Sequence, residues 1–247
     1  MEAQFDTTAS SLQAIQRQYE AIAHNLANVS TAGFKRNHTV FSQMLAARLG
    51  DAQAGAPEAD GAARVVGTTV IDFSQAHLVP TGRKLDVALE GGGFFVVETP
   101  AGPMYTRNGA FRVNAERQVV DSAGRSVAGE GGQITLPPAV SSEDLRIGTD
   151  GQVLAAGKSI GQLRVVEFKD VSVLRPAGES CFQAPEGVAG EPPANTLVRQ
   201  GFQEASNVNM VEELVGLITV SKLYEANIKS IRTEDERMKT ILQVAMG

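Results

Sequence analysis

The chain has 247 residues, of which 43% are hydrophobic and 20% are charged, and its formal net charge is -6. This length allows one large domain or two small ones, and the apolar fraction is sufficient for a core. Thinly spread acidic charge argues against nucleic acid as the main partner, because phosphate binding needs clustered Lys and Arg.

An amphipathic helix is predicted at residues 3–29. Its apolar positions recur at alternating spacings of three and four residues, which puts one stripe along a helix roughly 40 Å long. The stripe consists of Phe5, Thr8, Leu12, Ile15, Tyr19, Ile22, Leu26 and Val29. Asn28 and Gly33 can end the helix, since both tolerate the left-handed backbone found at helix ends. The stripe is thin, and such a helix is marginal in water on its own.

Two segments of different character follow. Residues 34–49 are predicted to form a second helical stretch, on the basis of the apolar positions Phe41, Met44, Leu45 and Leu49. Residues 50–63 are rich in Ala, Gly, Asp and Pro, which predicts a flexible linker or an exposed loop.

From Val65 the apolar period shortens to every second residue, which is typical of strands. We predict an antiparallel β-domain of many short strands joined by tight turns. Arg107-Asn108-Gly109 and Ser122-Ala123-Gly124 indicate two hairpin turns within it. The predicted strands are residues 68–73, 85–90, 94–98, 104–106, 110–113, 118–121, 125–128, 133–136, 145–147, 152–154 and 162–168, and residues 197–202 lead back to the C-terminal helix.

The last segment, residues 206–247, repeats the pattern of the N-terminal helix. Asn209 can cap the start of this helix, and Glu212 three residues later can form the reciprocal hydrogen bond to the cap residue. The predicted stripe consists of Leu214, Leu217, Ser221, Tyr224, Ile228, Ile231, Asp235, Met238, Leu242 and Ala245. A carboxylate in an apolar stripe needs a partner, so Asp235 either pairs with a basic side chain or lies where the helix frays.

The predicted fold class is α+β, with long N- and C-terminal helices pairing as a coiled coil and a central antiparallel all-β domain. Residues 1–35 and 205–247 form the paired helices in this plan, residues 36–64 a helix and linker, and residues 65–204 the β-domain. The helices bury their stripes most simply against each other, and the remaining apolar surface requires neighbouring chains. The expected assembly interface consists of Leu12, Ile15, Tyr19, Ile22, Leu26, Leu214, Leu217, Tyr224, Ile228 and Ile231.

We expect no catalytic residue, no cofactor, no small-molecule ligand and no metal site. His24, His38 and His77 are not spaced as metal ligands. Cys181 lacks the context of a nucleophile and fits a small apolar residue on a strand. No Gly-Lys-Ser/Thr follows Gly91-Gly92-Gly93, so these glycines indicate a bulge or tight bend where the backbone passes close to another segment, rather than a phosphate loop.

Targeting signals are also missing from the sequence pattern. No stretch of about 18 apolar residues occurs, so no membrane span is expected. The N-terminus has no basic segment followed by an apolar run, so no cleaved secretion signal is expected. The single cysteine excludes an intrachain disulfide.

Two terminal segments carry a family signature. Residues 24–36, His-Asn-Leu-Ala-Asn-Val-Ser-Thr-Ala-Gly-Phe-Lys-Arg, closely resemble the N-terminal motif of the bacterial flagellar basal-body rod and hook proteins. Residues 200–231 resemble the C-terminal motif of the same family, and residues 85–89 and 105–111 look like its shared β-domain core. The motif positions are Asn25, Leu26, Ala27, Asn28, Thr31, Gly33, Phe34, Ser206, Asn207, Val208, Glu213, Tyr224 and Glu225.

This resemblance implies a structural subunit of the flagellar rod, the periplasmic drive shaft that transmits motor torque. It implies partners as well: copies of this chain, other rod proteins and the flagellar type III export apparatus. The short middle of the chain is most similar to the proximal-rod type, while residues 208–225 are as similar to the distal-rod type. Two other classes compete with the rod interpretation, an adhesin-like secreted β-domain with helical arms and, more remotely, a hydrolase.

Overall fold

The computed structural model describes residues 2–44 and 64–246, and the chain divides into two compact units. Unit 1 comprises Met1–Ala27, Asn37–Ile71 and Asn209–Gly247, and unit 2 comprises Asn28–Arg36 and Asp72–Val208. The chain therefore passes between the units four times, and unit 2 is inserted within the sequence of unit 1. The fold class is α+β with a central antiparallel β unit, as predicted.

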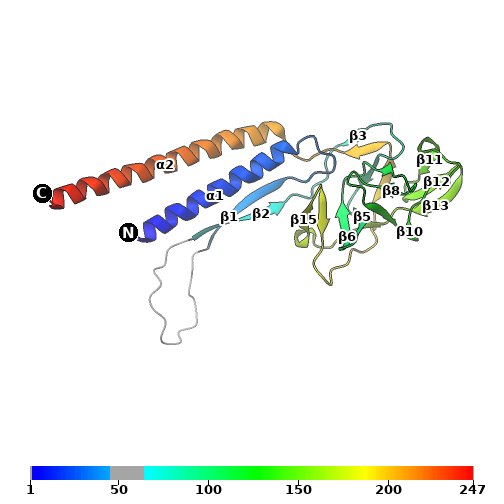
Figure 1. Cartoon of the computed structure of the whole chain (residues 1–247), viewed down its shortest axis with the longest axis horizontal. Helices are drawn as coiled ribbons and strands as arrows, with labels where there is room; N and C mark the ends of the chain where they lie inside the picture. Colours follow the sequence, from blue (N-terminus) through cyan, green and yellow to red (C-terminus); the bar gives the residue numbers. More distant parts are fainter. Residues whose placement is uncertain (1, 45–63, 247) are drawn as a thin grey trace, which may run out of the picture. The chain divides into compact units, whose positions relative to one another are not determined.

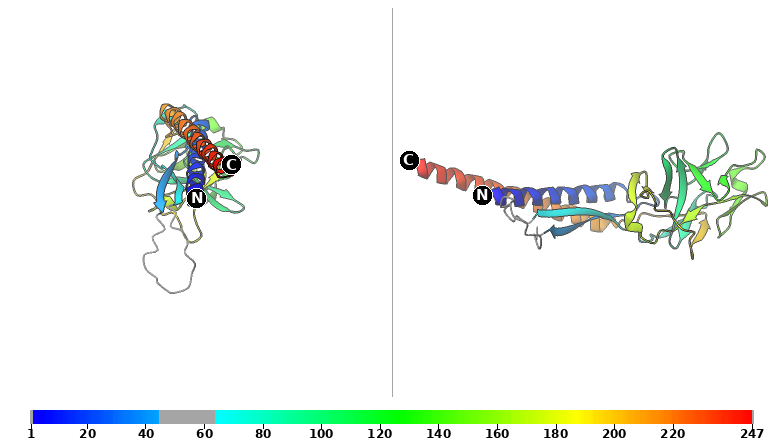
Figure 2. Two further views of the ribbon diagram at one scale, coloured as in Figure 1. Left: turned by 90° about the vertical axis from the view of Figure 1, so that its left-hand side faces the viewer. Right: turned by 90° about the horizontal axis from the view of Figure 1, so that it is seen from below.

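Unit 1 contains two long helices and a β-ribbon (Figure 1). Helix α1 spans Glu2–Ala27 and helix α2 spans Met210–Met246. Strand β1, Asn37–Met44, pairs antiparallel with β2, Arg64–Ile71. Helix α1 packs against α2 and against both strands of the ribbon. Because α2 has 37 residues and α1 has 26, α2 continues beyond the N-terminal end of α1 (Figure 2).

The helical prediction for residues 34–49 is wrong. Residues 37–44 form strand β1, which pairs with β2 over its whole length, from Asn37 opposite Ile71 to Met44 opposite Arg64. Thr39 and Val40 favour extended backbone, and β2, which is rich in Val and Thr, provides a strand partner. The prediction considered only the spacing of apolar residues within the segment and not this partner. Residues 45–49 and the predicted linker at 50–63 lie outside the described residues. The structure also groups residues 65–71, which the sequence pattern assigns to the β-domain, with unit 1.

The ends of both helices follow the predicted signals. After α1, the amide of Thr31 donates to the Asn28 carbonyl at 3.1 Å, and Gly33 has a left-handed φ of 66°. At the start of α2, the Asn209 side chain accepts from the amide of Val211 at 3.1 Å and donates to Glu212 at 3.2 Å. The stop at Asn28 and Gly33 and the cap at Asn209 are therefore confirmed.

Unit 2 is built from short antiparallel strands. Its largest sheet has nine strands, in the order β15-β16-β6-β5-β9-β8-β7, with β10 on β9 and β14 on β5. Three further groups are β11-β12-β13, β17-β4 and β18-β3. The bounds are β3 Leu78–Pro80, β4 Val87–Glu90, β5 Phe94–Thr99, β6 Gly102–Thr106, β7 Arg112–Val113, β8 Val119–Val120, β9 Ser126–Gly129, β10 Gly132–Gln133, β11 Leu145–Ile147, β12 Gln152–Ala155, β13 Lys158–Gln162, β14 Val165–Val166, β15 Arg175–Gly178, β16 Cys181–Gln183, β17 Leu197–Gln200 and β18 Phe202–Glu204.

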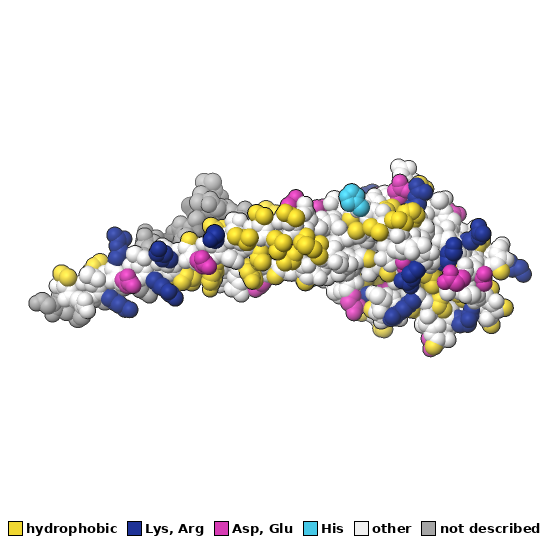
Figure 3. Space-filling view, turned by 90° about the horizontal axis from the view of Figure 1, so that it is seen from above, with side chains coloured by type: hydrophobic (Ala, Val, Ile, Leu, Met, Phe, Trp, Pro, Cys, Tyr) yellow, Lys and Arg dark blue, Asp and Glu magenta, His cyan; other side chains and the backbone are white. Residues whose placement is uncertain are grey.

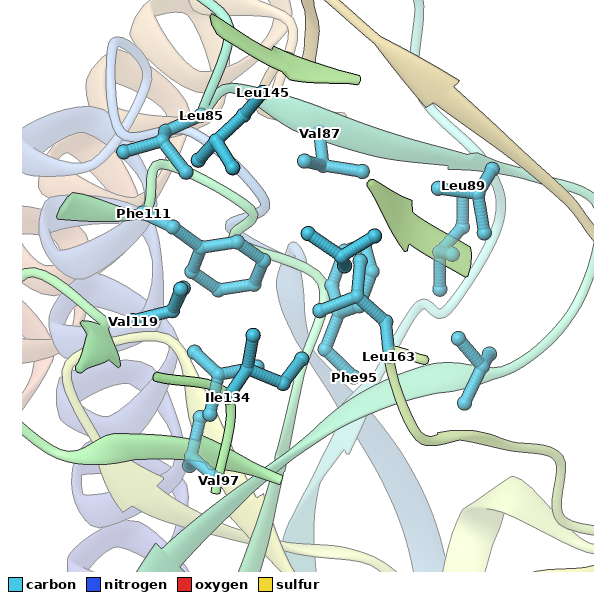
Figure 4. Packing of buried hydrophobic residues seen from close by; sticks show 14 of the residues in the cluster. Leu85, Val87, Leu89, Phe95, Val97, Phe111, Val119, Ile134, Leu145 and Leu163 are labelled. Atoms are coloured by element: carbon cyan, nitrogen blue, oxygen red, sulfur yellow. The ribbon is translucent and has the colours of Figure 1, made fainter. Parts of the chain in front are cut away.

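The core of unit 2 forms where the alternating residues of β4 and β5 meet the side chains of neighbouring strands (Figure 4). Val87, Leu89 and Phe95 are completely buried. The rings of Phe95 and Phe111 meet edge to face with centroids 5.2 Å apart. Cys181 lies on β16 and is buried, as predicted, and burial raises the pKa of its thiol.

One of the two predicted hairpins is wrong. Strand β6 pairs with β5 and β16, while β7 pairs with β8, so Arg107-Asn108-Gly109 does not join two paired strands. Gly109 is needed for another reason: a Cβ there would lie 1.7 Å from the carbonyl oxygen of Val87. The second hairpin is confirmed, because Val120 of β8 pairs with Ser126 of β9 around a left-handed Gly124.

Gly91, Gly92 and Gly93 form a bend where the backbone passes close to other segments, as predicted. Gly91 and Gly93 have φ of 110° and 93°. A Cβ on either would approach a carbonyl oxygen to 3.0 Å, and one on Gly92 would lie 2.4 Å from the carboxylate of Glu167.

Candidate assembly site

Three stretches of unit 2 lie next to unit 1 in the sequence and are joined to one another by hydrogen bonds. We call them the motif junction, and they are residues 33–36, 72–76 and 204–207. The amide of Gly33 donates to the carbonyl of Glu204 at 2.8 Å. The Asn207 side chain accepts from the amide of Arg36 at 2.7 Å and donates to the carbonyl of Asp72 at 2.8 Å. Segments of the N-terminal and C-terminal family motifs therefore meet inside unit 2.

A buried charge cluster lies at the centre of the motif junction. The Lys35 ammonium is 2.6 Å from the Glu204 carboxylate, and both side chains are 0% exposed. Lys35 also donates to the carbonyl of Ser74 at 2.7 Å, and the amide of Ala76 donates to Glu204 at 3.0 Å. Arg107 approaches the other carboxylate oxygen of Glu204 at 3.4 Å. The single carboxylate of Glu204 thus faces two cations and one backbone amide.

The electrostatics of this cluster depend on its removal from water. Burial lowers the pKa of the Lys35 ammonium, and the Glu204 carboxylate partly offsets that effect. Burial lowers the pKa of the Arg107 guanidinium in the same way. Arg107 is held in addition by a bond to the carbonyl of Gly91 at 3.0 Å and by the ring of Phe94, 5.3 Å from its guanidinium carbon. Both cations therefore depend on the Glu204 carboxylate for the compensation of their charge.

Unit 1 has its own buried polar contact at Asn25. Its amide nitrogen donates to the carbonyl of Asn37 at 2.6 Å and to the Glu213 carboxylate at 3.2 Å, and its oxygen accepts from the amide of Asn37 at 2.8 Å. Asn25 and Glu213 are 1% and 2% exposed. This one side chain therefore fixes the end of α1 against the first turns of α2 and the start of β1.

We expect Asn25→Asp to lower the free energy of unfolding of unit 1 by about 1.5–3 kcal/mol, because it replaces the donor to a buried carboxylate with a second acceptor. Thermal unfolding followed by far-ultraviolet circular dichroism measures the loss of helix. Gln16→Glu is the matched control, since the Gln16 amide donates to Glu20 at 3.0 Å on the exposed side of α1. That change should cost no more than about 0.5 kcal/mol. Equal losses in the two variants would contradict a special role for Asn25.

The ten predicted interface residues are covered to different extents in the single chain. Ile22 is buried, and a Cβ on Gly216 would lie 3.3 Å from it. Leu12, Ile15, Leu26, Leu217, Ile228 and Ile231 are half-buried. Tyr19, Leu214 and Tyr224 are exposed. The side chain of Asp235 lies outside those that the structure describes.

Three buried apolar residues in the described parts of the helices fall outside the predicted interface: Ala14 and Ala21 of α1 and Val220 of α2. Their positions lie beside the predicted stripes. Ala14 and Ala21 are seven residues apart, as are Glu213 and Val220. This heptad spacing was the signal in the sequence that could have identified these positions as buried.

The remaining motif positions divide between buried and surface sites. Gly33, Phe34 and Val208 are buried, and Asn28, Thr31, Ser206 and Asn207 are half-buried. Ala27 and Glu225 are exposed. Lys35, Arg107 and Glu204 all fall within the quoted family segments, but no feature of the sequence singled out any of the three as a site residue.

A groove lies between the helices of unit 1, with a volume of about 440 Å³. We call it the helix groove. Its lining includes Ile15 and Tyr19 from α1 and Val220, Ser221, Tyr224 and Glu225 from α2. Within residues 2–44 and 64–246, no cluster of His, Cys, Asp or Glu is arranged to hold a metal ion. Among the described helices, none has an apolar stretch long enough to cross a membrane.

Comparisons with known proteins agree with the positions of the motif segments. Residues 5–35 match the family described as flagella basal body rod protein, residues 88–155 the flagellar hook protein FlgE/F/G D1 domain, and residues 199–244 the flagellar basal body rod FlgEFG protein C-terminal region. Paired terminal segments around a β unit, with these three matches in order, define a flagellar axial structural protein.

The chain belongs to the flagellar basal-body rod protein family. The rod protein FlgG of Buchnera aphidicola from Schizaphis graminum is 36% identical over 256 residues, covering 94% of this chain and 96% of that protein. FlgG of Agrobacterium fabrum is 35% identical over 92% of this chain and 94% of its own length. FlgF of Caulobacter vibrioides is 31% identical over 93% and 92%. The resemblance predicted from the terminal motifs is confirmed: this is a structural rod subunit, and its family is not an enzyme family.

Proposed function

We propose that the chain polymerises through α1 and α2 into the periplasmic part of the rod and that the assembled rod transmits motor torque. The observation that carries the proposal is the incomplete burial of the helix pair. Tyr19, Leu214 and Tyr224 remain exposed in the single chain although they belong to the apolar stripes. Exposed apolar surface of this kind is typical of a face that another chain covers.

The proposed mechanism is mechanical rather than chemical. In this proposal α1 and α2 pair as a coiled coil, and residues 1–35 and 205–247 act as the axial assembly domain. The partners are copies of this chain and other rod proteins. Load that reaches unit 2 enters through chain segments that the motif junction binds together. A buried charge cluster at that point resists local opening, because breaking it leaves charges without water or partner.

Export belongs to the same proposal. The chain reaches the basal body through the flagellar type III export apparatus without a cleaved signal peptide. The choice between a proximal and a distal position in the rod stays a prediction, since relatives named FlgF and FlgG both match the chain over nearly its whole length. The comparisons do not favour the adhesin-like or hydrolase alternatives, and we propose that the chain catalyses no reaction.

We expect Ile228→Asp to abolish polymerisation while leaving unit 2 folded, because a charge on the half-buried face of α2 is costly to cover. The measurement is motility in soft agar, with electron microscopy of basal bodies, in a strain that depends on this chain for its rod. Ser230→Asp places the same charge two residues away on an exposed position and should support normal motility. Swimming cells that carry Ile228→Asp would show that this stripe is not the assembly surface.

A further inference from the structure

Asn108 and Gly109 form the only Asn-Gly pair in the chain. Both residues have a place in the fold of unit 2. The Asn108 side-chain oxygen accepts from the amide of Ala110 at 3.0 Å, and a Cβ on Gly109 would lie 1.7 Å from the carbonyl oxygen of Val87. Because glycine has no side chain, the nitrogen that follows the asparagine is unhindered, and the pair is chemically reactive. The packing of unit 2 thus requires a reactive pair at residues 108 and 109.

We infer that Asn108 is a deamidation site in the unfolded chain, that the folded unit 2 protects it, and that the isoaspartate product prevents unit 2 from folding. The inference concerns unit 2 alone and does not depend on polymerisation. An unfolded copy therefore has a limited time in which it can still fold.

The reaction needs only the chain and water. The Gly109 nitrogen attacks the side-chain carbonyl carbon of Asn108, a carbon–nitrogen bond forms between them, and the bond to the side-chain nitrogen breaks. That nitrogen leaves as ammonia with the proton that Gly109 loses, and a succinimide ring remains. Water opens the ring at either of its carbonyl carbons, which gives aspartate or isoaspartate. Isoaspartate carries the main chain through the former side chain and so lengthens the backbone by a carbon atom.

Hydrogen bonds restrain the reacting pair in the folded chain. Besides the bond from Ala110, the amide of Asn108 donates to the Thr106 hydroxyl at 3.0 Å. The Gly109 carbonyl accepts from the amide of Val87 at 3.0 Å. Attack requires the nitrogen and the carbon to meet in line at about 3–3.5 Å, so the side chain and the peptide plane must turn, and these bonds resist both motions. We therefore expect the reaction to follow the small population of opened chains.

The isoaspartate product does not fit the folded unit 2. A Cβ on Gly33 would lie 2.4 Å from the amide nitrogen of Asn108 and 2.7 Å from its Cα, so an added carbon has no space on this side. Lengthening the chain here moves Arg107, the preceding residue, away from its 3.4 Å approach to Glu204. Aspartate keeps the backbone length, and its carboxylate can accept from the Ala110 amide as Asn108 does. The two products should therefore differ in their ability to fold.

The first measurement is the rate of deamidation in the full-length chain, followed by mass spectrometry in native buffer and in guanidinium chloride. The rate should be at least about tenfold lower in the native chain. A synthetic peptide of residues 104–113 is the control for solvent, and it should react equally fast in both solutions. Equal rates in the native and the denatured chain, or a denatured chain that stays unmodified, would overturn the inference.

The second measurement sorts the products by folding. Denatured chains are aged, diluted into native buffer and exposed to a biotinylated thiol reagent, which captures chains whose Cys181 is accessible. Isoaspartate should be enriched at least about tenfold over aspartate in the captured chains. The chain concentration is kept low, because apolar side chains gather over the first turns of α2 and favour association (Figure 3). An equal distribution of the two products would show that the lengthened backbone does not prevent folding.

Two variants separate the added length from the added charge. Asn108→Asp has the charge of the aspartate product on a normal backbone, so thiol labelling of Cys181 should give the denaturant midpoint of the unaltered chain. A much lower midpoint would assign the defect to charge and contradict the inference. Asn108→Gln can react only through a larger ring, which forms far more slowly, so it should refold as well after ageing as before. Loss of refolding in aged Asn108→Gln would place the damage at another residue.

Discussion

Glu204→Gln should lower the free energy of unfolding of unit 2 by about 3–5 kcal/mol, because it leaves two buried cations without their counter-charge. The substitution keeps the size of the side chain, so a cavity is not the cause. Labelling of the Cys181 thiol across a denaturant series reports the unfolding of unit 2, since this thiol is the only one in the chain and is buried.

A matched ion pair on the surface gives the control. Arg199 and Glu90 are also 2.6 Å apart, but their side chains are 45% and 48% exposed. Glu90→Gln should therefore cost no more than about 1 kcal/mol, because water screens and replaces the lost interaction. Similar losses in the two variants would show that burial does not decide the strength of the Glu204 cluster.

The pH dependence has a definite sign. The pKa of Lys35 in the folded chain lies below its ordinary value of 10.5, so the unfolded state binds more protons and stability rises as pH rises through that interval. Removing the Glu204 carboxylate lowers the pKa of Lys35 further. The Glu204→Gln variant should therefore recover part of its lost stability as the solution is made alkaline, over a wider pH range than the unaltered chain.

Gly33→Ala is the second large effect that we expect, at about 2–5 kcal/mol for unit 2. Gly33 has φ of 66°, and a Cβ there would lie 2.4 Å from the amide nitrogen of Asn108 and 2.5 Å from the carbonyl carbon of Arg107. Both atoms are backbone, so they move only if the segment that carries Arg107 moves. The substitution thus strains the backbone and displaces the charge cluster together.

Gly82 separates the two causes. Its φ is 76°, but a Cβ would meet nothing within 4 Å. Gly82→Ala should therefore cost only the left-handed backbone term, about 1–2 kcal/mol. Thiol labelling of Cys181 measures both variants under the same conditions. If Gly33→Ala and Gly82→Ala cost the same, the close approach to Asn108 has no consequence for stability.

The sequence correctly predicted helix ends and tight turns, which depend on residues close together in the chain. The Asn209 cap, the stop at Gly33 and the turn at Gly124 depend on residues within a few positions of each other. The alternation of Leu85, Val87 and Leu89 predicted a strand, although Asp86 and Ala88 on its other face are buried as well. These predictions hold because side-chain period and backbone preference act over one short segment.

The missed parts depend on distant partners. Residues 37–44 became a strand because β2 lies alongside them, although their apolar spacing is compatible with a helix. The Arg107-Asn108-Gly109 segment has hairpin residues, yet its glycine is required by the close approach to Val87 of β4, a strand of another sheet. Glu204 has no local signature, since its role exists only where Lys35 and Arg107 meet it. Strand β15 was not predicted; it contains Pro176 and lies at the edge of its sheet, where a proline is tolerated.

The distance along the chain between α1 and α2 has a consequence for timing. Helix α1 is among the first segments to be made, and its partner α2 begins only at Met210. During N-terminus-first synthesis or passage through a narrow channel, α1 therefore waits without its partner while the β unit folds between them. The helix groove is complete only when Val220, Ser221, Tyr224 and Glu225 of α2 have been made. Under the proposed polymerisation, a copy truncated before α2 has no helix groove and cannot join the rod.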